Sequence, residues 1–389
     1  MFLSVTLSRN PELAEYAVHL HRTGQIRPNT YVLDLDTIRY NAQQLVDTAY
    51  RNGIHLYMMT KQLGRIPEVA QAITDSGITK AVAVDPWEAL HLAQAGIALG
   101  NVGHLVQIPS SMVDEIVSCQ PEVITVFSVE KAKEISDAAQ KQGKIQDLLL
   151  KVVAKGDVVF EGQWGGFREE EVRSAVSRIR QLPGVHIAGV TSFPCFLFNG
   201  ECLQPTENVH TLLRCAEMLE TELGEPLKQI NAPSATACAT IPLLRQLGAT
   251  HGEPGHALTG TTPLHQRPGQ LERPAMVYVS EVSHTDGETA YVFGGGHYRR
   301  SHMKGALVGK SFPEMANRRL DATELAPESI DYYTGLKMDG QNVDVGDTAL
   351  YSFRTQIFVT RAEVVVVEGL QEGHPTLVGV YDSLGKRLR

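Results

Sequence analysis

Apolar residues in the first two thirds of the chain follow two alternating spacings. Short continuous apolar runs, typical of buried strands, are each followed by a segment whose apolar positions recur at helical spacing. The clearest helix follows the run HLYMMT at 55–60, where Ile66, Val69, Ala70 and Ile73 form one apolar stripe. Buried strands that alternate with amphipathic helices predict a parallel sheet covered by helices.

This pattern predicts strands at TYVLDLD (30–36), HLYMMT (55–60), AVAV (81–84), VGHLVQI (102–108), VITVFSV (123–129), DLLLKVVA (147–154), VHIAGVTSF (185–193) and LKQINA (227–232). After AVAV, we expect Asp85 to cap a helix that begins at Pro86. Glu88 would complete a capping box and Gly96 would end that helix. About eight strand and helix units favour a (β/α)8 TIM-type barrel over a doubly wound sheet, which usually has fewer strands.

The pattern changes at about residue 267. The runs AMVYVSEVSH, ETAYVFGGG, KGALVG, DTALYSF, RAEVVVVEGL and TLVGVYDS are short, β-like and separated by Gly, Asp and His. Few helical spacings lie between them, which predicts a second, mainly antiparallel β domain. We therefore expect an N-terminal segment at 1–28 that packs on the β domain or a partner, a barrel at 29–266 and a C-terminal β domain at 267–389.

Composition narrows the class of protein. The chain has 389 residues, of which 43% are hydrophobic and 20% charged, as in ordinary globular proteins. Its formal charge, 35 minus 44 or −9, argues against nucleic acid as its main partner. No apolar segment approaches the roughly 20 residues of a membrane span, and the N-terminus lacks a secretory pattern. These features predict a cytoplasmic protein without a membrane partner, whose five cysteines are free thiols.

Lys61 ends the apolar run at 55–60 where the next helix begins. Barrel enzymes carry their chemistry at the C-terminal ends of their strands, although many lysines at such positions are solvated surface residues. The mostly apolar flanks LYMM and LGRIP predict partial desolvation of Lys61. Desolvation lowers the pKa of an amine and makes it a usable nucleophile for a Schiff base.

Two further motifs carry candidate chemistry. INAPSATACAT (230–240) places Ser234 and Thr236 at a predicted strand-to-helix turn, where backbone N–H groups suit a phosphate. The same two residues could instead simply cap a helix. In HGEPGHALTG (251–260), Gly255 allows close backbone approach to a ligand, and Glu253 is a candidate acid.

Together these motifs resemble the fold-type III pyridoxal-phosphate (PLP) enzymes, which include alanine racemases, ornithine and diaminopimelate decarboxylases and D-threonine aldolases. TYVLDLDTIRYNAQQL, with Asn41, is similar to the family's first strand and helix, and MMTKQLGR stands where the family has its cofactor lysine. AVDPWEALHLAQAGI is similar to the third unit of the family's barrel. The likeness is closest to the YhfX-like branch of the alanine-racemase-like group. LLLKVVAKGDVVFEGQWGGF departs from the racemases because it lacks their Asp-Thr-Gly-Met run.

The resemblance implies a site for pyridoxal 5'-phosphate. Lys61 would form the internal aldimine, while Ser234, Thr236 and Gly255 would contact the phosphate. Glu253 would face the pyridine nitrogen, where a carboxylate keeps the ring protonated and makes it a strong electron sink. The triplet Glu-Pro-Gly matches the family's decarboxylases, whereas alanine racemases have an arginine there.

Thr191 and Ser192 lie where family members often carry a histidine that contacts the cofactor, and Ser192 cannot stack on a ring. His297 and Tyr298 follow three glycines in FGGGHYRRS, which would let the backbone approach a ligand. Glycine runs are also ordinary hairpin features. His297 is thus a candidate substrate-binding residue, and Tyr298 a candidate proton donor.

VYDSLG (380–385) resembles the decarboxylases' Cys-Asp-Ser-Leu segment, which reaches the site of the partner subunit, with Tyr381 in place of the cysteine. The resemblance implies that Asp382 recognises a substrate amino group or that Tyr381 protonates Cα, but Tyr381 could equally be a buried tyrosine of a final strand. Racemisation needs a second acid/base opposite the lysine. Tyr298, Tyr381 and Tyr351 are the candidates.

We expect a homodimeric PLP-dependent racemase or epimerase whose small-molecule substrate is an amino acid with an acidic, basic or small neutral side chain. Barrel spacing and short length favour this activity, while Glu253 and YDSLG favour the alternative of a decarboxylase or lyase. A non-catalytic PLP-binding protein is a second alternative, although such relatives lack the β domain. A cofactor-free Schiff-base aldolase is a third, which leaves Glu253 without a cofactor to serve. No metal is expected, because the fourteen histidines show no ligand spacing such as HExxH.

Overall fold

The structure is a computed structural model that describes residues 2–324, 326 and 328–389. Contacts within the chain divide it into two compact units. The first, the β unit, comprises Met1–Ala42, Lys61–Ala72 and His256–Arg389. The second, the barrel unit, comprises Gln43–Thr60 and Ile73–Gly255. The division therefore assigns the first 42 residues and the short segment that begins with Lys61 to the β unit.

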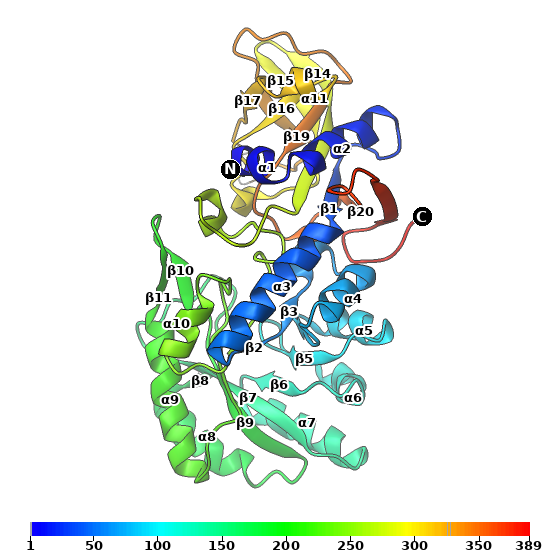
Figure 1. Cartoon of the computed structure of the whole chain (residues 1–389). Coiled ribbons are helices and arrows are strands. Elements are labelled where there is room, and N and C mark those ends of the chain that lie inside the picture. The colour runs from blue at the N-terminus through cyan, green and yellow to red at the C-terminus, as the bar shows by residue number, and fades with distance from the viewer. Residues whose placement is uncertain (1, 325, 327) are drawn as a thin grey trace. The chain divides into compact units, whose positions relative to one another are not determined.

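The barrel unit is built on a parallel sheet that closes on itself (Figure 1). Its strand order is β2-β13-β12-β9-β7-β6-β5-β4-β3, and all neighbours in this order are parallel. Strands β2 (His55–Leu56) and β3 (Met58–Met59) are separated only by Tyr57, so the two ends of the sheet belong to one stretch of chain. If β2 and β3 count as one strand, the described residues form eight barrel strands. The predicted (β/α)8 barrel is confirmed.

Helices alternate with these strands and flank them (Figure 1). The remaining barrel strands are β4 (Ala81–Ala83), β5 (Leu99–Val102), β6 (Val123–Val126), β7 (Gln146–Val153), β9 (Val185–Thr191), β12 (Gln229–Asn231) and β13 (His251–Gly252), with β8 (Phe167–Arg168) beside β7 and a hairpin of β10 (Phe196–Phe198) and β11 (Leu203–Pro205). The helices are α5 (Pro86–Gln94), α6 (Val113–Ser118), α7 (Val129–Lys141), α8 (Val172–Ile179), α9 (Glu207–Leu223) and α10 (Ile241–Gln246), with short turns η2 (Ser110–Met112) and η3 (Glu169–Glu171). Two helices, α3 (Leu35–Asn52) and α4 (Pro67–Asp75), have residues in both units.

The helix predicted after AVAV forms as α5, and Asp85 caps it by accepting a hydrogen bond from the backbone N–H of Glu88. The carboxylate of Glu88 was expected to complete a capping box. It binds instead to residues that directly follow two barrel strands, β3 and β4. It accepts hydrogen bonds from Thr60 Oγ1 at 2.6 Å and from Val84 N at 2.9 Å. Since Thr60 immediately precedes Lys61 in the chain, Glu88 fixes the end of the strand segment from which Lys61 departs.

Strand β5 lies earlier in the chain than predicted. The strand expected at 102–108 runs from Leu99 to Val102. The prediction missed its start because the strand contains Gly100 and Asn101, two residue types that are uncommon in strands. A Cβ atom at Gly100 would lie 2.2 Å from the Tyr57 ring, so only glycine permits this close approach. The corrected boundary leaves His104 just beyond the C-terminal end of the strand.

The β unit contains a nine-stranded sheet within the described residues. Its main order is β17-β16-β19-β14-β1-β20-β21, and β15 and β18 extend from β14. The strand predicted at 30–36 belongs to this sheet as β1 (Thr30–Asp34), which is antiparallel to β14 and parallel to β20. All five residues of β1 are buried. A fully buried strand has the same continuous apolar pattern in either sheet, so only the pairing reveals where it belongs.

The other strands of this unit are β14 (Met276–Asp286), β15 (Thr289–Phe293), β16 (Gly305–Gly309), β17 (Arg319–Asp321), β18 (Tyr333–Lys337), β19 (Thr348–Tyr351), β20 (Glu363–Glu368) and β21 (Thr376–Tyr381). Its helical elements are α1 (Leu3–Arg9), α2 (Pro11–Arg22), α11 (Phe312–Met315), η1 (Lys61–Leu63), η4 (Pro263–Gln266), η5 (Arg299–Ser301) and η6 (Ile357–Val359). Helices α1 and α2 pack on the sheet, where Leu13 and Leu20 share one core with Val277 and Val365.

The five cysteines are free thiols, as predicted. Within the described ranges, no helix is long and apolar enough to cross a membrane. The same residues contain no group of three or more His, Cys, Asp and Glu side chains that could hold a metal ion.

Asn41 holds the first part of α3 within the β unit and provides a test of the fold. Its Nδ2 donates hydrogen bonds to Leu258 O at 3.0 Å and Arg273 O at 2.8 Å, and its Oδ1 accepts one from Arg273 N at 2.7 Å. Asn41→Ala leaves these backbone groups without partners, so we expect the free energy of unfolding to fall by about 2–3 kcal/mol. Urea denaturation followed by circular dichroism measures this change.

The matched control is Asn52→Ala in the same helix. Among the described residues, the amide of Asn52 donates only to Thr48 O, one turn earlier, at a partly buried position. We expect this substitution to change the free energy of unfolding by less than about 0.5 kcal/mol. Equal losses in the two variants would contradict the role assigned to Asn41.

Candidate functional site

Glu253 lies in a buried polar cluster of the barrel unit. It follows β13 directly, and its side chain has no exposed surface. Its Oε1 accepts hydrogen bonds from Asn231 Nδ2 at 2.8 Å and from Asn101 Nδ2 at 3.2 Å. Its Oε2 lies 3.7 Å from Nε2 of His104, whose side chain is also fully buried. Two amides from different strands therefore fix the orientation of this carboxylate.

The cluster is built from the C-terminal ends of barrel strands. Asn231 is the last residue of β12, Asn101 lies next to the end of β5, and His104 and Glu253 follow their strands. A closed parallel sheet brings such ends to one face, where barrel enzymes carry their catalytic groups. Thr125 of β6 extends the network, because its Oγ1 donates to Asn101 Oδ1 at 2.8 Å and thereby fixes which way the amide points.

Two neighbouring strand ends at this face carry buried polar atoms that lack a hydrogen-bond partner. Thr191, the last residue of β9, lies opposite Asn231 of β12. Thr191 Oγ1 and Asn231 Oδ1 bind none of the residues that the structure describes. Buried polar atoms almost always have a partner, so this face fits a ligand with polar ring substituents, as PLP has. Ser192 differs, since its hydroxyl already donates to Val152 O at 3.0 Å.

The turn predicted to bind phosphate is present, but the helix after it begins later than expected. Because α10 starts at Ile241, Ser234 and Thr236 precede its first turn, and the helix dipole does not act on them. The hydroxyl of Ser234 exchanges hydrogen bonds with the backbone N and O of Phe196, each at 2.8 Å. Thr236 Oγ1 accepts a hydrogen bond from Glu253 N at 3.0 Å. Thr236 thus ties this turn to the strand end that carries Glu253.

Gly255 is the last residue of the barrel unit and follows Pro254. The carbonyl of Pro254 accepts a hydrogen bond from Met59 N of β3 at 2.9 Å. The Glu-Pro-Gly triplet therefore runs beside the strand segment that ends two residues before Lys61 in the chain. This arrangement brings Glu253, Gly255, Thr191, Ser192 and Thr236 to the C-terminal face of the barrel.

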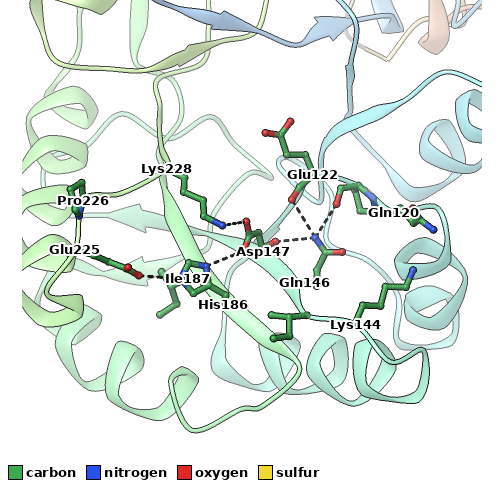
Figure 2. Close-up of a pocket in the computed structure, with 12 residues that line it drawn as sticks. Gln120, Glu122, Lys144, Gln146, Asp147, His186, Ile187, Glu225, Pro226 and Lys228 are labelled. Atoms are coloured by element: carbon green, nitrogen blue, oxygen red, sulfur yellow. Dashed lines mark hydrogen bonds and ion pairs between the residues drawn. The ribbon is translucent and has the colours of Figure 1, made fainter.

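A depression of about 850 Å³ lies at the other face of the barrel (Figure 2). Its lining comes from the N-terminal ends of β6, β7, β9 and β12. His186 lies between Asp147 at 2.9 Å and Glu225 at 3.2 Å, and Lys228 pairs with Asp147 at 2.7 Å. These polar groups are already paired with one another, and they lie at the N-terminal ends of the strands, so we do not assign the chemistry to this depression.

In the β unit, Lys61 begins η1 and is only 7% exposed, which agrees with the predicted desolvation. The turn that follows packs on η6. A Cβ atom at Gly64 would lie 3.3 Å from Ile357 Cγ2, and the guanidinium of Arg65 stacks on the ring of Phe358 at 4.6 Å. The segment that carries Lys61 is thus anchored on residues between β19 and β20.

Three cationic side chains of the β unit, those of Lys61, Arg300 and Arg354, act electrostatically on His256, and we call them the cationic cluster. Burial lowers the pKa of His256 well below its ordinary value, and the positive charges of Arg354, Lys61 and Arg300 lower it further. Tyr298 lies at the same cluster. Burial raises the pKa of its phenol, and Arg354 and Arg300 partly offset that rise. Arg300 and Arg354 therefore act on both His256 and Tyr298, and Lys61 acts on His256.

The other candidates in the β unit have different surroundings. His297 Nε2 shares a hydrogen bond with Thr334 Oγ1 at 2.9 Å, and burial lowers the pKa of His297 to about 4, so the ring is neutral at pH 7. Burial and then Glu68 raise the pKa of Tyr381 to about 12. The carboxylate of Asp382 accepts two backbone N–H groups of the C-terminal turn, each at 2.9 Å.

Three residues described above were not predicted from the sequence as site residues. Asn231 stands at the end of the predicted strand 227–232, and its position at a strand end was a usable signal. His104 was hidden because the strand was expected at 102–108, which made it a strand-interior residue. Arg354 lies between β19 and η6 in a segment without a motif, so no sequence signal distinguishes it.

Comparison with known families places these features in context. Residues 33–263 match the alanine racemase N-terminal domain, and residues 277–377 match the YhfX-like C-terminal domain. The chain is 45% identical to the Escherichia coli (strain K12) protein designated "Uncharacterized protein YhfX", over 100% of both chains. It is 27% identical to alanine racemase 1 of Clostridium acetobutylicum over 62% of this chain and 60% of that one. It is 25% identical to the lysine racemase of Thermotoga maritima over 53% and 54% of the two chains.

Solved structures with the same fold include racemases and other enzymes. The alanine racemase of Clostridium difficile 630 in complex with cycloserine has a TM-score of 0.64 and 18% identity, covering 92% of this chain and 99% of that one. The D-threonine aldolase of Filomicrobium marinum has a TM-score of 0.67 and 16% identity, covering 92% and 95%. The D-threo-3-hydroxyaspartate dehydratase of Delftia sp. HT23 has a TM-score of 0.65 and 16% identity, covering 92% and 97%. At these identities the likeness shows the fold alone.

The alanine racemase domain covers more than half of the chain, and the full-length relative matches both units. The chain therefore belongs to the alanine-racemase-like family of fold-type III enzymes, whose cofactor is pyridoxal 5'-phosphate, and within it to the branch with a YhfX-like C-terminal domain.

Proposed function

We propose that this protein is a PLP-dependent racemase or epimerase that acts at the α carbon of an amino acid. The buried carboxylate of Glu253, fixed by Asn101 and Asn231 at the C-terminal face of the barrel, supports PLP chemistry at Cα. The similarity to an alanine racemase and a lysine racemase supports racemisation as the reaction. When bound, PLP supplies an electron sink for a carbanion at Cα. Glu253 would hold the proton on the ring nitrogen, which strengthens that sink.

Lys61 has the properties of the residue that holds the cofactor. It is buried, and Glu88 fixes the preceding residue, Thr60, through a 2.6 Å hydrogen bond. A desolvated amine is a better nucleophile toward an aldehyde. After the substrate amine displaces it, the Lys61 amine would move a proton at one face of Cα.

The second acid/base is best assigned to Tyr298. Arg354 and Arg300 act on its phenol and also on His256, which Lys61 affects as well, and Tyr298 is not fully buried. Tyr351 is enclosed by other aromatic rings, with Tyr278 at 5.6 Å between centroids. Tyr381 is fully buried beside Arg387, whose guanidinium lies 5.7 Å from the ring. Both of these phenols are buried among protein side chains, which does not favour proton transfer to a substrate.

A lyase or decarboxylase is the alternative activity. It is supported by Glu253, since a fully protonated ring stabilises the carbanions that these reactions produce. The aldolase and dehydratase with the same fold agree with it. The alternative of a non-catalytic PLP-binding protein does not account for the β unit or for the cationic cluster that includes Lys61. The proposal also includes a homodimer in the cytoplasm, which light scattering and cell fractionation would test.

The first prediction concerns Lys61. Borohydride reduction of the purified protein with PLP should leave a pyridoxyl group on the peptide that contains Lys61, as read by mass spectrometry. Lys61→Ala should remove this product, because the amine that would carry the pyridoxyl group is then lost. Lys310→Ala is the control, since Lys310 is exposed and paired with Asp344 at 2.7 Å. A pyridoxyl peptide in the Lys61→Ala protein would refute the assignment.

The second prediction concerns Glu253. Glu253→Gln keeps an Oε1 atom for the amides of Asn101 and Asn231 but loses the negative charge. We expect the variant to retain PLP and to exchange the Cα proton of substrate in D2O about 100-fold more slowly, as measured by proton NMR. Glu122→Gln, at the opposite barrel face, should change the rate little. Unchanged exchange in Glu253→Gln would contradict its role.

The third prediction separates the tyrosines. Tyr298→Phe should lower racemisation by about 100-fold or more, because protonation from the second face is lost. Exchange of the Cα proton by Lys61 with retention should survive. Chiral chromatography and proton NMR measure the two rates on one sample. If Tyr381→Phe had this effect and Tyr298→Phe did not, the assignment would pass to Tyr381.

A further inference from the structure

The turn that follows β5 presents two side chains to the carboxylate of Glu253. Asn101, next to the last residue of the strand, donates a hydrogen bond from Nδ2 to Glu253 Oε1 at 3.2 Å. His104, just beyond the end of the strand, places its Nε2 atom 3.7 Å from Glu253 Oε2. One short stretch of chain therefore addresses both oxygens of this carboxylate.

Hydrogen bonds and close packing fix this turn in one conformation. Gly103 has a φ of +87°, and a Cβ atom there would lie 2.7 Å from Thr125 O, so only glycine fits. Gln107 ties the turn to β6, because its Nε2 donates to Gly103 O at 2.8 Å and to Thr125 O at 2.9 Å. The rings of His104 and Phe193 meet edge to face, with their centroids 5.6 Å apart. Packing thus holds His104 in place.

The pair of Glu253 and His104 is enclosed by protein. Neither side chain has exposed surface, and burial disfavours an ionised carboxylate. The amides of Asn101 and Asn231 bind Oε1, whereas Oε2 faces Nε2 of His104. An imidazole nitrogen faces a carboxylate oxygen favourably only when it carries a proton, because two lone pairs repel each other. A proton-bearing imidazole at this distance favours the ionised form of the carboxylate.

We propose that His104 is a positioning residue that keeps Glu253 ionised, so that the proton shared by Glu253 and the pyridine nitrogen of PLP lies on the nitrogen. This inference rests on the proposed function and adds to it the control of the charge on Glu253. The N–H group of His104 stabilises the carboxylate more than the carboxylic acid, which shifts the shared proton from Glu253 to the ring. A protonated ring is the stronger electron sink. His104 thus acts through Glu253.

The first test observes the ring nitrogen directly. The holoenzyme is prepared with PLP labelled with 15N in the ring, and the 15N NMR shift distinguishes a protonated from an unprotonated nitrogen. His104→Phe keeps an aromatic ring beside Phe193 but has no N–H group. We expect the ratio of protonated to unprotonated nitrogen to fall at least about tenfold in this variant at neutral pH. His104→Gln retains an N–H donor and should give a smaller change in the same direction.

The matched control is His186→Phe in the same unit. His186 also lies beside carboxylates, Asp147 at 2.9 Å and Glu225 at 3.2 Å, but at the N-terminal ends of the strands. This substitution should leave the 15N signal unchanged. Glu253→Gln is the positive reference, because it removes the charge that His104 maintains. An unchanged 15N signal in His104→Phe, together with a shifted signal in Glu253→Gln, would overturn the proposal.

A second measurement needs no cofactor. The protein is labelled with 13C at its glutamate carboxyl groups, and the NMR signal of Glu253 is assigned by its absence in Glu253→Gln. We expect Glu253 to be ionised in the unmodified protein at neutral pH, and its protonated fraction to rise at least about tenfold in His104→Phe. His104→Gln should again change less, and it carries the test if phenylalanine prevents folding. The same Glu253 signal in all three proteins would mean that His104 does not control this charge, and the proposal would be wrong.

The two proposals fail in different ways. If the protein binds no PLP, or if no pyridoxyl group forms on Lys61 after reduction, the proposed function is wrong. The 13C signal of Glu253 would still decide whether His104 controls the charge of this carboxylate.

Discussion

The closure of the parallel sheet through residues 55–59 is the constraint on which the barrel unit depends. β2 pairs with β13 and β3 pairs with β4, so one short stretch joins both ends of the sheet. Tyr57 makes the junction rigid, because its hydroxyl accepts a hydrogen bond from Gln229 Nε2 at 2.7 Å and its ring packs on Gly100. Closure brings the C-terminal ends of the strands to one face, and Glu253 becomes buried among their amides.

Buried charge is treated in two different ways in this protein. In the barrel unit, Glu253 is oriented by the amides of Asn101 and Asn231, which hold it without neutralising it. In the β unit, the buried Nε atom of Arg354 has no hydrogen-bond partner among the described residues. Hydrogen-bonded burial of a carboxylate preorganises a catalytic group, whereas burial of a cation without a partner leaves its binding energy for a ligand. The proposed function uses the first arrangement.

Much of the fold could be predicted, because the signals are local. Parallel strands buried on both faces appear as continuous apolar runs, and helices as apolar stripes such as that of Val69 and Ile73 in α4. The Asp85 cap is also local. The partner sheet of β1 could not be predicted, because a buried strand looks alike in either sheet. The start of α10 was misplaced, because Ser and Thr favour turns as well as caps.

The sequence by itself determined the barrel, the second β domain, the family and the burial of Lys61, since each depends on periodicity or on a motif within a few residues. Only the tertiary structure decided which groups meet. Asn101 and Glu253 are 152 residues apart in sequence, yet closure of the sheet joins them in one hydrogen bond. The position of Arg354 in the same cationic cluster as Lys61 is likewise a product of packing in the β unit. Such contacts depend on strand pairing over long separations, which local patterns do not encode.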